Sequence, residues 1–441
     1  MKEMPTKRPP PPWKKGDGTP GVERPQRAWL LSAAPGEAPE ALVEESLREL
    51  EALAKTAGAE TAGRTACRLR AIQPATYIGK GKAEEVAEAC RGNGVDLVLF
   101  DDDLSPAQGQ NLGALLGVPV VDRTQLILDI FAQRARTVEG RLQVELAQLQ
   151  YALPRLRGLW THLERQKGGI GLKGPGEKQL ELDRRRIGQR IHRIGELLED
   201  VRRHRAEIRQ GRRRHGWAQV ALVGYTNAGK STLLNRLGAS EVLADDLLFA
   251  TLDPTTRAIR LPNRQRCLLT DTVGFIRKLP HHLVEAFKAT LEEVREADLL
   301  LHVVDCSHPF ADEQVEAVEH VLAELGAGGK PVLALLNKTD LERGWNQATR
   351  LADRFAHWVR ISARTGEGVA AMLEEVADAL NGGMARLRLR LPAGEGKGLA
   401  RLHAAGHVLS QKFRGGYVYL EVSLPKAAAA ALPKDWVRGE G

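Results

Sequence analysis

The sequence predicts an α/β protein: a small α/β domain at the N-terminus, an antiparallel helical hairpin, a second α/β domain with a mostly parallel sheet, and a small α+β domain at the C-terminus. Three patterns support this fold class. Apolar strand-like segments alternate with helical segments in two stretches, two heptad patterns flank a glycine-rich loop, and strand-like segments surround one helix near the end. The expected parts are a disordered tail at 1–26, then 27–136, 137–215, 216–382 and 383–441.

The first 26 residues are basic and rich in proline, and they contain no apolar core. Such a segment cannot bury enough surface to offset the cost of ordering, and it lacks the apolar centre of a secretory signal. No segment approaches the ~18 consecutive apolar residues of a spanning helix. The four cysteines form no C-x-x-C pair. This argues against a zinc site and fits a cytoplasmic protein.

The first α/β domain is predicted from alternating segments that begin at Arg27. Ser105 is expected to cap a helix whose first residue is Pro106. Asp101, Asp102 and Asp103 follow a strand without clustered partners, and we expect them to be solvated. The expected elements are strands at 29–33, 96–100 and 118–121, and helices at 41–57, from 105 onward and at 124–136.

Two heptad patterns predict the helical hairpin. The first contains Leu142, Leu146, Leu149, Leu153, Leu156, Trp160 and Leu163, and the second contains Ile187, Ile191, Ile194, Leu198 and Val201. Pro154 should kink the first helix. The segment from Gly168 to Gly176 is too rich in glycine to be helical. We therefore expect an antiparallel pair of helices with this glycine loop at its tip.

The second helix of the hairpin carries most of the positive charge. The formal net charge of the chain is +8, and between Asp183 and His215 twelve arginines stand against five acids, which leaves +7. A solvated helix face is the alternative interpretation. Because five acids cannot pair with twelve arginines, we favour contact with phosphates. The expected RNA-contacting residues are Lys173, Arg184, Arg185, Arg186, Arg212, Arg213 and Arg214.

A phosphate-binding loop is predicted at Gly224-Tyr-Thr-Asn-Ala-Gly229-Lys230-Ser231, which matches G-x-x-x-x-G-K-[ST]. The motif follows an apolar strand and precedes a helix, and this context argues against a chance glycine-rich turn. The backbone N–H groups should surround the phosphates. We expect Lys230 to reach the β- and γ-phosphates and Ser231 to ligate Mg²⁺.

Two further motifs predict a guanine nucleotide. Asp271-Thr-Val-Gly274 ends a strand, where the acid can hold the magnesium shell and Gly274 can donate its N–H to the γ-phosphate. In Asn337-Lys338-Thr339-Asp340, the last carboxylate can accept hydrogen bonds from N1–H and the 2-amino group of guanine, which adenine lacks. The expected nucleotide contacts are Gly224, Tyr225, Thr226, Asn227, Ala228, Gly229, Lys230, Ser231, Thr232, Phe249, Ala250, Thr251, Leu252, Asp253, Asp271, Thr272, Val273, Gly274, Asn337, Lys338, Asp340, Ser362, Ala363 and Arg364.

The segment from Phe249 to Thr256 should contain the threonine that binds Mg²⁺ when the γ-phosphate is present, and spacing leaves Thr251, Thr255 and Thr256 open. Phe275 stands where many GTPases have a water-orienting glutamine. We therefore expect slow intrinsic hydrolysis that depends on a partner. We also hypothesise that Asn227 helps to ligate K⁺; an equal hydrolysis rate in sodium and potassium would exclude this.

Long specific segments resemble the HflX family of ribosome-associated GTPases, and the resemblance covers nearly the whole chain. It is carried by 77–82, 104–108, 111–112, 121–124, 130–137, 143–148, the glycine loop from Gly168 to Glu177 with Gln179, 249–255 and 271–276. Val138 stands where a polar or basic residue is expected. The lysines of Gly79-Lys80-Gly81-Lys82 are equally consistent with a phosphate contact and with a turn before a helix.

The resemblance implies a function. It selects Thr251 as the magnesium-binding switch threonine, so that Ser231 and Thr251 hold the metal and Lys230, Thr251 and Gly274 serve catalysis. It implies GTP and GDP with Mg²⁺, and binding to the 50S subunit, the 70S ribosome and ribosomal RNA near the peptidyl-transferase centre. We also expect the protein to be a cytoplasmic monomer. In the GTP state such a protein splits or rescues stalled ribosomes. ATP use through the N-terminal domain is also implied for some members, although no second phosphate loop is found there.

Two other functions remain open from the sequence. One is an RNA-binding assembly protein in which GTP hydrolysis times release, and the other is an NTPase that remodels free RNA. Stimulation of hydrolysis by ribosomal subunits favours a ribosome factor or an assembly protein, whereas unwinding of free duplex favours the remodelling NTPase. Splitting of intact 70S particles separates the ribosome factor from the assembly protein.

Overall fold

The computed structural model describes residues 25–158, 175–214, 217–238, 248–278, 280, 291–381, 384–405, 407–425, 428–429 and 432–440. The chain divides into two compact units: the first extends to Leu198 and also includes Lys278–Ala286, and the second comprises Glu199–Arg277 and Phe287–Gly441. The division into five parts stays a prediction. No helix in the described ranges is long and apolar enough to cross a membrane.

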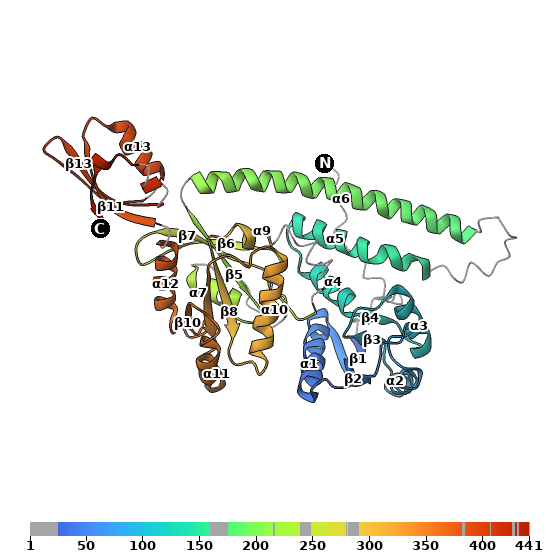
Figure 1. The fold of residues 1–441 in the computed structure, drawn as a ribbon. Coiled ribbons are helices and arrows are strands. Elements are labelled where there is room, and N and C mark those ends of the chain that lie inside the picture. Colours follow the sequence, from blue (N-terminus) through green and yellow to red (C-terminus); the bar gives the residue numbers. More distant parts are fainter. Residues whose placement is uncertain are drawn as a thin grey trace. The chain divides into compact units, whose positions relative to one another are not determined.

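The first unit contains the predicted parallel sheet, with strand order β2-β1-β3-β4 (Figure 1). Strand β1 already begins at Gln26, so the predicted tail is one residue too long. Strand β2 was not predicted, because most of its residues are exposed or half-buried at the sheet edge and leave no apolar pattern. The elements are β1 (Gln26–Pro35), α1 (Glu40–Ala57), β2 (Ala59–Leu69), α2 (Lys80–Gly92), β3 (Leu97–Phe100), α3 (Pro106–Leu116), β4 (Val120–Asp122) and α4 (Arg123–Arg134).

Helix caps fix the ends of two helices in this unit. Ser105 and Gln108 form a reciprocal capping box at the start of α3, and Pro106 is the first helical residue, as predicted. The carboxylate of Asp122 accepts a hydrogen bond from the backbone N–H of Gln125 and caps α4. These caps satisfy backbone donors that a helix leaves open.

The helical hairpin is formed by α5 (Val138–Ala152), a 3₁₀ segment η1 (Leu153–Gly158) and α6 (Pro175–Arg214). The sequence predicted a kink at Pro154; in the structure the α-helix already ends at Ala152, and Pro154 lies in the 3₁₀ segment η1. Helices α5 and α6 run side by side in Figure 1, and Arg190 of α6 donates to Glu145 of α5 at 2.6 and 2.8 Å. The glycine loop was predicted too long, because Pro175 and Gly176 already belong to α6. Residues 159–174, including Lys173, lie outside the described part of the chain.

The two heptad patterns have different outcomes. On α6, Ile194 is fully buried and the other predicted positions are half-buried, so this pattern is confirmed. On α5, Gln143, Val144 and Ala147 are the most buried, whereas the predicted leucines are only half-buried. The reason is that α5 also packs against α4, so it buries a second face that a heptad pattern does not reveal.

The second unit has a six-stranded sheet of order β10-β9-β8-β5-β7-β6, in which only the β6–β7 pair is antiparallel. This confirms the mostly parallel sheet. Strand β5 lies near its centre and is almost wholly buried. The elements are β5 (Ala218–Gly224), α7 (Lys230–Leu237), β6 (Thr255–Arg260), β7 (Arg266–Asp271), α9 (Glu292–Glu296), β8 (Leu299–Asp305), α10 (Ala311–Glu324), β9 (Val332–Asn337), α11 (Glu342–Ala352), β10 (Trp358–Arg360) and α12 (Val369–Asn381).

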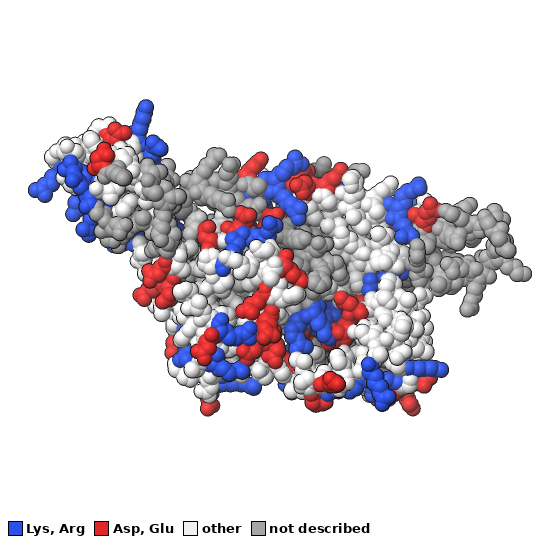
Figure 2. All heavy atoms as spheres, in the orientation of Figure 1, with Lys and Arg blue, Asp and Glu red and all other residues white. Residues whose placement is uncertain are grey.

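The last part of the chain forms an antiparallel sheet of order β12-β13-β11-β14, which confirms the predicted small α+β fold. On the face drawn in Figure 2, Lys and Arg side chains project from the region that Figure 1 labels β13. The elements are β11 (Met384–Pro392), α13 (Gly396–Ala405), β12 (His407–Arg414), β13 (Tyr417–Pro425), a 3₁₀ turn η2 (Lys434–Trp436) and β14 (Val437–Glu440).

We predict that Ile194→Ala destabilises the protein by about 2–4 kcal/mol, because it removes a fully buried side chain from α6. Leu197→Ala is the matched control on the same helix; Leu197 is 41% exposed, and its truncation should cost less than about 1 kcal/mol. Urea unfolding followed by circular dichroism measures both. Equal effects of the two substitutions would contradict the burial pattern of α6.

Candidate functional site

The phosphate loop joins the buried strand β5 to helix α7, and two of its positions require glycine. Gly224 has φ +147°, and a Cβ there would lie 2.3 Å from the carbonyl oxygen of Val303. Gly229 has φ +103°, and a Cβ there would lie 2.3 Å from Nδ2 of Asn337. Both conformations exclude ordinary L side chains. The loop therefore packs directly against β8 and the last residue of β9.

Lys230 lies in the middle of the site and is almost completely buried. Its ammonium group donates to the carbonyl oxygens of Gly224 and Tyr225, at 3.0 and 2.7 Å. Burial lowers the pKa of Lys230 to about 8, although the nearby Asp271 carboxylate acts in the opposite direction. The loop carbonyls thus hold a lysine whose charge is poorly solvated, which is suited to receive an anionic ligand.

Three oxygen-bearing side chains meet beside Lys230. The Ser231 hydroxyl donates to Oδ2 of Asp271 at 2.7 Å, the Thr251 hydroxyl donates to the same oxygen at 2.9 Å, and the two hydroxyl oxygens are 2.8 Å apart. Oδ1 of Asp271 is buried and has no hydrogen-bond partner among the described residues. An all-oxygen group with an unsatisfied carboxylate oxygen fits Mg²⁺, which prefers such ligands. The residues present therefore suit this metal.

The structure separates the three candidate threonines. Thr251 lies with Ser231 and Asp271, whereas Thr255 and Thr256 are the first residues of β6. The hydroxyl group of Thr256 is 2.9 Å from that of Thr270 on the neighbouring strand. Of the three, Thr251 is the one whose side chain reaches the possible metal position.

The segment after Asp271 pairs with the phosphate loop. The backbone N–H of Phe275 donates to Gly224, and the carbonyl of Phe275 accepts from Thr226 at 2.7 Å. A Cβ at Gly274 would lie 2.8 Å from Cα of Thr226 and 3.1 Å from Nζ of Lys230. The Phe275 side chain is fully buried. Gly274 thus keeps the pocket open, and Phe275 anchors the segment without presenting a polar group.

The loops after β9 and β10 form one hydrogen-bonded unit. Asn337 donates to the carbonyl of Ala228 at 2.7 Å and accepts from the backbone N–H of Ala363 at 2.9 Å. Asp340 accepts from the Ser362 hydroxyl at 2.9 Å and pairs with Arg364. Burial raises the pKa of Asp340, but these hydrogen bonds and the Arg364 charge outweigh it and hold the pKa below its usual value. The carboxylate therefore stays ionised and can accept hydrogen bonds.

Eleven of the twenty-four predicted nucleotide contacts line one pocket, and several others are buried beside it. Tyr225, Leu252 and Val273 are buried and support the backbone; Ala228 and Phe249 are buried as well. Lys338 is held by an ion pair with Asp305 at 2.6 Å. The pocket is lined by Thr226, Asn227, Gly229, Lys230, Ser231, Thr232, Phe249, Ala250, Thr251, Thr272 and Gly274.

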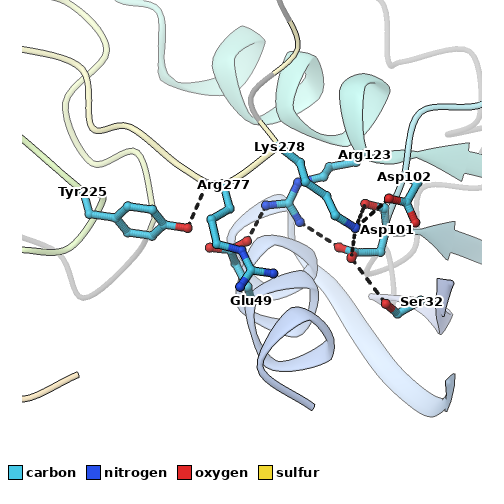
Figure 3. Close-up of polar contacts among 8 residues, drawn as sticks. All are labelled: Ser32, Glu49, Asp101, Asp102, Arg123, Tyr225, Arg277 and Lys278. Atoms are coloured by element: carbon cyan, nitrogen blue, oxygen red, sulfur yellow. Dashed lines mark hydrogen bonds and ion pairs between the residues drawn. The ribbon is translucent and has the colours of Figure 1, made fainter. Parts of the chain in front are cut away.

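The expectation that the three aspartates after β3 are solvated is wrong for Asp101 and Asp102. The Asp101 side chain is fully buried and pairs with Arg123 at 2.7 Å, and Arg123, itself buried, also pairs with Glu49 (Figure 3). Lys278 reaches Asp101 at 2.8 Å and Asp102 at 2.6 Å. These partners come from distant positions in the sequence, which explains why a local pattern did not reveal them.

The chain leaves the second unit directly after the segment that pairs with the phosphate loop. The backbone N–H of Arg277 donates to the Tyr225 hydroxyl at 2.8 Å, and the next residue, Lys278, belongs to the first unit (Figure 3). Lys278 was not among the predicted site residues. Its position four residues after Gly274 was the available signal, but no motif marks it.

A second pocket lies in the first unit beside α3, β4 and η1. Its polar side includes Asp122, Tyr151 and Arg155. Arg155 donates to Asp122 at 3.0 Å and to the carbonyl of Leu104 at 2.7 Å, and its guanidinium lies 3.5 Å from the centre of the Tyr151 ring. Burial raises the pKa values of both Asp122 and Tyr151.

Comparison with known proteins gives consistent matches along the chain. Residues 44–132 match a family model described as "GTP-binding GTPase N-terminal", 134–212 match "GTP-binding GTPase Middle Region", and 219–338 match "50S ribosome-binding GTPase". A relative named GTPase HflX from Magnetococcus marinus is 47% identical over 95% of this chain and 97% of its own. GTPase HflX from Lacrimispora saccharolytica is 46% identical over 92% and 95%, respectively. The Escherichia coli protein of the same name is 48% identical over 86% and 90%.

We predict that the buried Lys230 makes stability depend on pH. An unfolded lysine has a pKa of about 10.4, so between pH 8 and about 10.4 the unfolded chain binds a proton that the folded chain lacks. The unfolding free energy therefore rises with pH in this window, by up to about 3 kcal/mol. Urea unfolding across this pH range measures the free energy of unfolding of the wild type and of Lys230→Met, and the wild-type value minus the variant value should rise with pH. A difference that stays flat or falls with rising pH would contradict the depressed pKa.

Proposed function

Because the chain belongs to the HflX family of GTPases, we propose that it associates with the 50S ribosomal subunit and splits or rescues stalled ribosomes in its GTP-bound state. The chain binds GTP and hydrolyses it to GDP and phosphate, as the family does. The observation that carries the ribosomal proposal is the match of 219–338 to a family model described as "50S ribosome-binding GTPase". The basic helix α6 supports it by its charge.

The residues of the phosphate pocket have distinct roles in this proposal. The loop N–H groups and Lys230 hold the β- and γ-phosphates, and the partial positive charge of the α7 N-terminus adds to the binding. Ser231 and Thr251 hold Mg²⁺, which neutralises charge on the phosphates when it is bound. Gly274 offers its N–H to the γ-phosphate. The close approach of Gly274 to Lys230 supports this role, because any side chain would fill the space.

Guanine is selected by Asp340 in this proposal. The Ser362 and Arg364 side chains orient its carboxylate and keep it ionised. A fixed carboxylate accepts from N1–H and the 2-amino group of guanine, and adenine would leave it unpaired. Asn337 contributes by joining the phosphate loop to Ala363, so that the phosphate and base contacts form one connected structure.

Hydrolysis depends on a partner in this proposal. The fully buried Phe275 presents no group that can orient water, so the catalytic contribution of a glutamine has to come from elsewhere. Asn227 is exposed beside the pocket, which is compatible with K⁺ binding at this position. The ribosome supplies the remaining stimulation.

The proposed RNA contact lies on α6. Arg184, Arg185 and Arg186 are exposed. Within the described residues, their one ion pair joins Arg186 to Asp183 at 3.7 Å. A pair at this distance on the surface contributes little to stability. These arginines are therefore available for phosphates. Arg212, Arg213 and Arg214 lie in the last turn of α6 and remain predicted contacts.

Lys278 links the nucleotide to the first unit in this proposal. Loss of the γ-phosphate releases the segment after Gly274. Lys278 continues that segment and binds the buried Asp101 and the half-buried Asp102. A change in the position of Gly274 is therefore passed along four residues of chain to a charge cluster that tolerates little rearrangement.

Two alternative functions remain to be separated by experiment. In an assembly protein, the GTPase would time release from RNA without splitting ribosomes. In a remodelling NTPase, free RNA would be the substrate. ATP use at the second pocket is a further alternative from the family resemblance; this pocket has no glycine-rich loop among its described lining residues.

We predict that 50S subunits or 70S ribosomes stimulate GTP hydrolysis by at least tenfold, whereas 30S subunits do not. The physical reason is that Phe275 leaves the attacking water unpositioned until a partner completes the site. Phosphate release by the purified full chain is measured with each particle. Thr251→Ala is the control and should abolish stimulation, because it removes a proposed magnesium ligand.

Splitting of 70S particles in the GTP state, followed by sedimentation, then distinguishes the ribosome factor from the assembly protein. No stimulation by any particle would contradict the ribosomal proposal and leave the GTPase assignment intact.

We predict that Lys278→Met leaves basal hydrolysis within about twofold but lowers stimulation by 50S subunits at least fivefold. The substitution keeps the length of the side chain and removes its ion pairs with Asp101 and Asp102. Lys330→Met is a matched control, because Lys330 donates to the Ala297 carbonyl far along the chain from the switch segment. If Lys278→Met and Asp102→Asn act through one ion pair, the double variant should lower stimulation by 50S subunits no further than Lys278→Met alone. Unchanged stimulation would exclude Lys278 as the link.

A further inference from the structure

The C-terminal sheet has one face covered and one face open among the described residues. The covered face carries the apolar core of this part, which includes Leu389, Val418, Leu420 and Val422, and helix α13 packs against it through Leu402. Along β11 and β13 the buried residues alternate with exposed or half-buried ones. This period of two places the other side chains on the opposite face.

The register shows which side chains share the open face. In antiparallel pairs, directly opposed residues point to the same side. Tyr419 is opposed by Arg390 on β11 and by Lys412 on β12, and Tyr417 is opposed by Arg414 on β12. Arg388 opposes Glu421 two residues further along β13. Among the described residues, the open face therefore carries Arg388, Arg390, Pro392, Ser410, Lys412, Arg414, Tyr417, Tyr419 and Glu421.

The two tyrosines are unusually exposed for aromatic residues in the middle of a sheet. Tyr417 is 36% exposed and Tyr419 is 41% exposed. The Arg390 guanidinium lies 4.2 Å from the centre of the Tyr417 ring, which is cation–π geometry. No ion pair in the described part of the chain involves Arg388, Arg390, Lys412 or Arg414. Four cations and one acid leave this face with three net positive charges.

Two aromatic rings between two rows of cations are suited to a single-stranded nucleic acid. Each ring offers a flat surface for an unstacked base, and cations on the strands to either side can neutralise the phosphates. An apolar protein partner fits poorly, because among the described residues of the open face Pro392, opposite Tyr417, is the one aliphatic side chain. A duplex also fits poorly, because its bases are already stacked on one another.

We propose that the open face of the C-terminal sheet binds single-stranded RNA by stacking bases on Tyr417 and Tyr419. The stacking surface follows from the geometry of the sheet, and the choice of RNA over DNA rests on the proposed ribosomal function. Tyrosine hydroxyls can also contact the ribose 2′-OH, which DNA lacks. This site is separate in sequence from α6, where the proposed contacts are with phosphates alone.

The test is binding of a fluorescent oligouridine of roughly twelve nucleotides to the full chain, followed by anisotropy. The double variant Tyr417→Ala/Tyr419→Ala should bind at least about tenfold more weakly, since both stacking surfaces are removed. Tyr417→Phe/Tyr419→Phe keeps the rings and should stay within about threefold. Phe413→Ala is the matched control: Phe413 is 68% exposed on the same sheet but opposes Val418 on the other face, so its truncation should change little.

Salt dependence separates this site from the arginines of α6. Phosphate contacts weaken steeply with salt, whereas stacking persists, so the fold decrease in affinity caused by the alanine pair should be the same at low and at raised salt. Lys412→Ala/Arg414→Ala should reduce the slope of log affinity against log salt by about 1.4, or about 0.7 for each phosphate of a single strand that is no longer neutralised.

Three outcomes would overturn the proposal: equal RNA affinity of the alanine pair and the wild type, an equally large decrease in the phenylalanine pair, or a preference for oligothymidine over oligouridine. Stimulation of GTP hydrolysis by 50S subunits is measured with the same variants. If RNA affinity is unchanged while stimulation persists, this proposal fails and the ribosomal function stands. If stimulation is absent even in the wild type, the ribosomal function fails, and the oligouridine result alone decides the stacking site.

Discussion

The nucleotide site depends on the buried carboxylate of Asp271. It lies at the end of β7, where it is almost completely buried, and one of its oxygens accepts hydrogen bonds from both Ser231 and Thr251. These three residues come from a strand end, a helix N-terminus and an intervening loop. A carboxylate in this position has to be balanced by donors and by Lys230. The hydroxyl groups of Ser231 and Thr251 and the ammonium group of Lys230 lie close enough to stabilise its charge.

The parallel sheet explains how distant motifs come together. Strands β5, β7 and β9 all end at the same edge, so the residues that follow them meet there without long loops. Glycine then decides how closely they approach. Gly224 and Gly229 let the phosphate loop contact its neighbours, and Gly274 lies where a Cβ would come within 3.1 Å of the Lys230 ammonium and block the pocket.

Structural features encoded by a few neighbouring residues could be predicted from the sequence, whereas contacts between residues far apart in the chain could not. The phosphate loop, the capping box at Ser105 and the interruption of the helix near Pro154 are encoded within a few residues, and the sequence was sufficient for them. The buried state of Asp101 depends on Arg123 and Lys278, which lie 22 and 177 residues further along the chain, and no local pattern reveals such partners. Edge strand β2 was missed for a related reason, because an exposed strand has no apolar face to detect.

The cations of this chain differ in the groups that contact them, and this difference determines what each positive charge can bind. Lys230 is buried and held by carbonyl groups, which leaves its charge available to a phosphate ligand. Arg123 is equally buried but pairs with carboxylates, so its charge is satisfied inside the first unit. On the surface, the arginines at the start of α6 and the cations of the C-terminal sheet have few acidic neighbours. Of these two surfaces, the sheet is the one that combines such cations with exposed aromatic rings. This difference is the reason for proposing contact with bases at the sheet and contact with phosphates alone at α6.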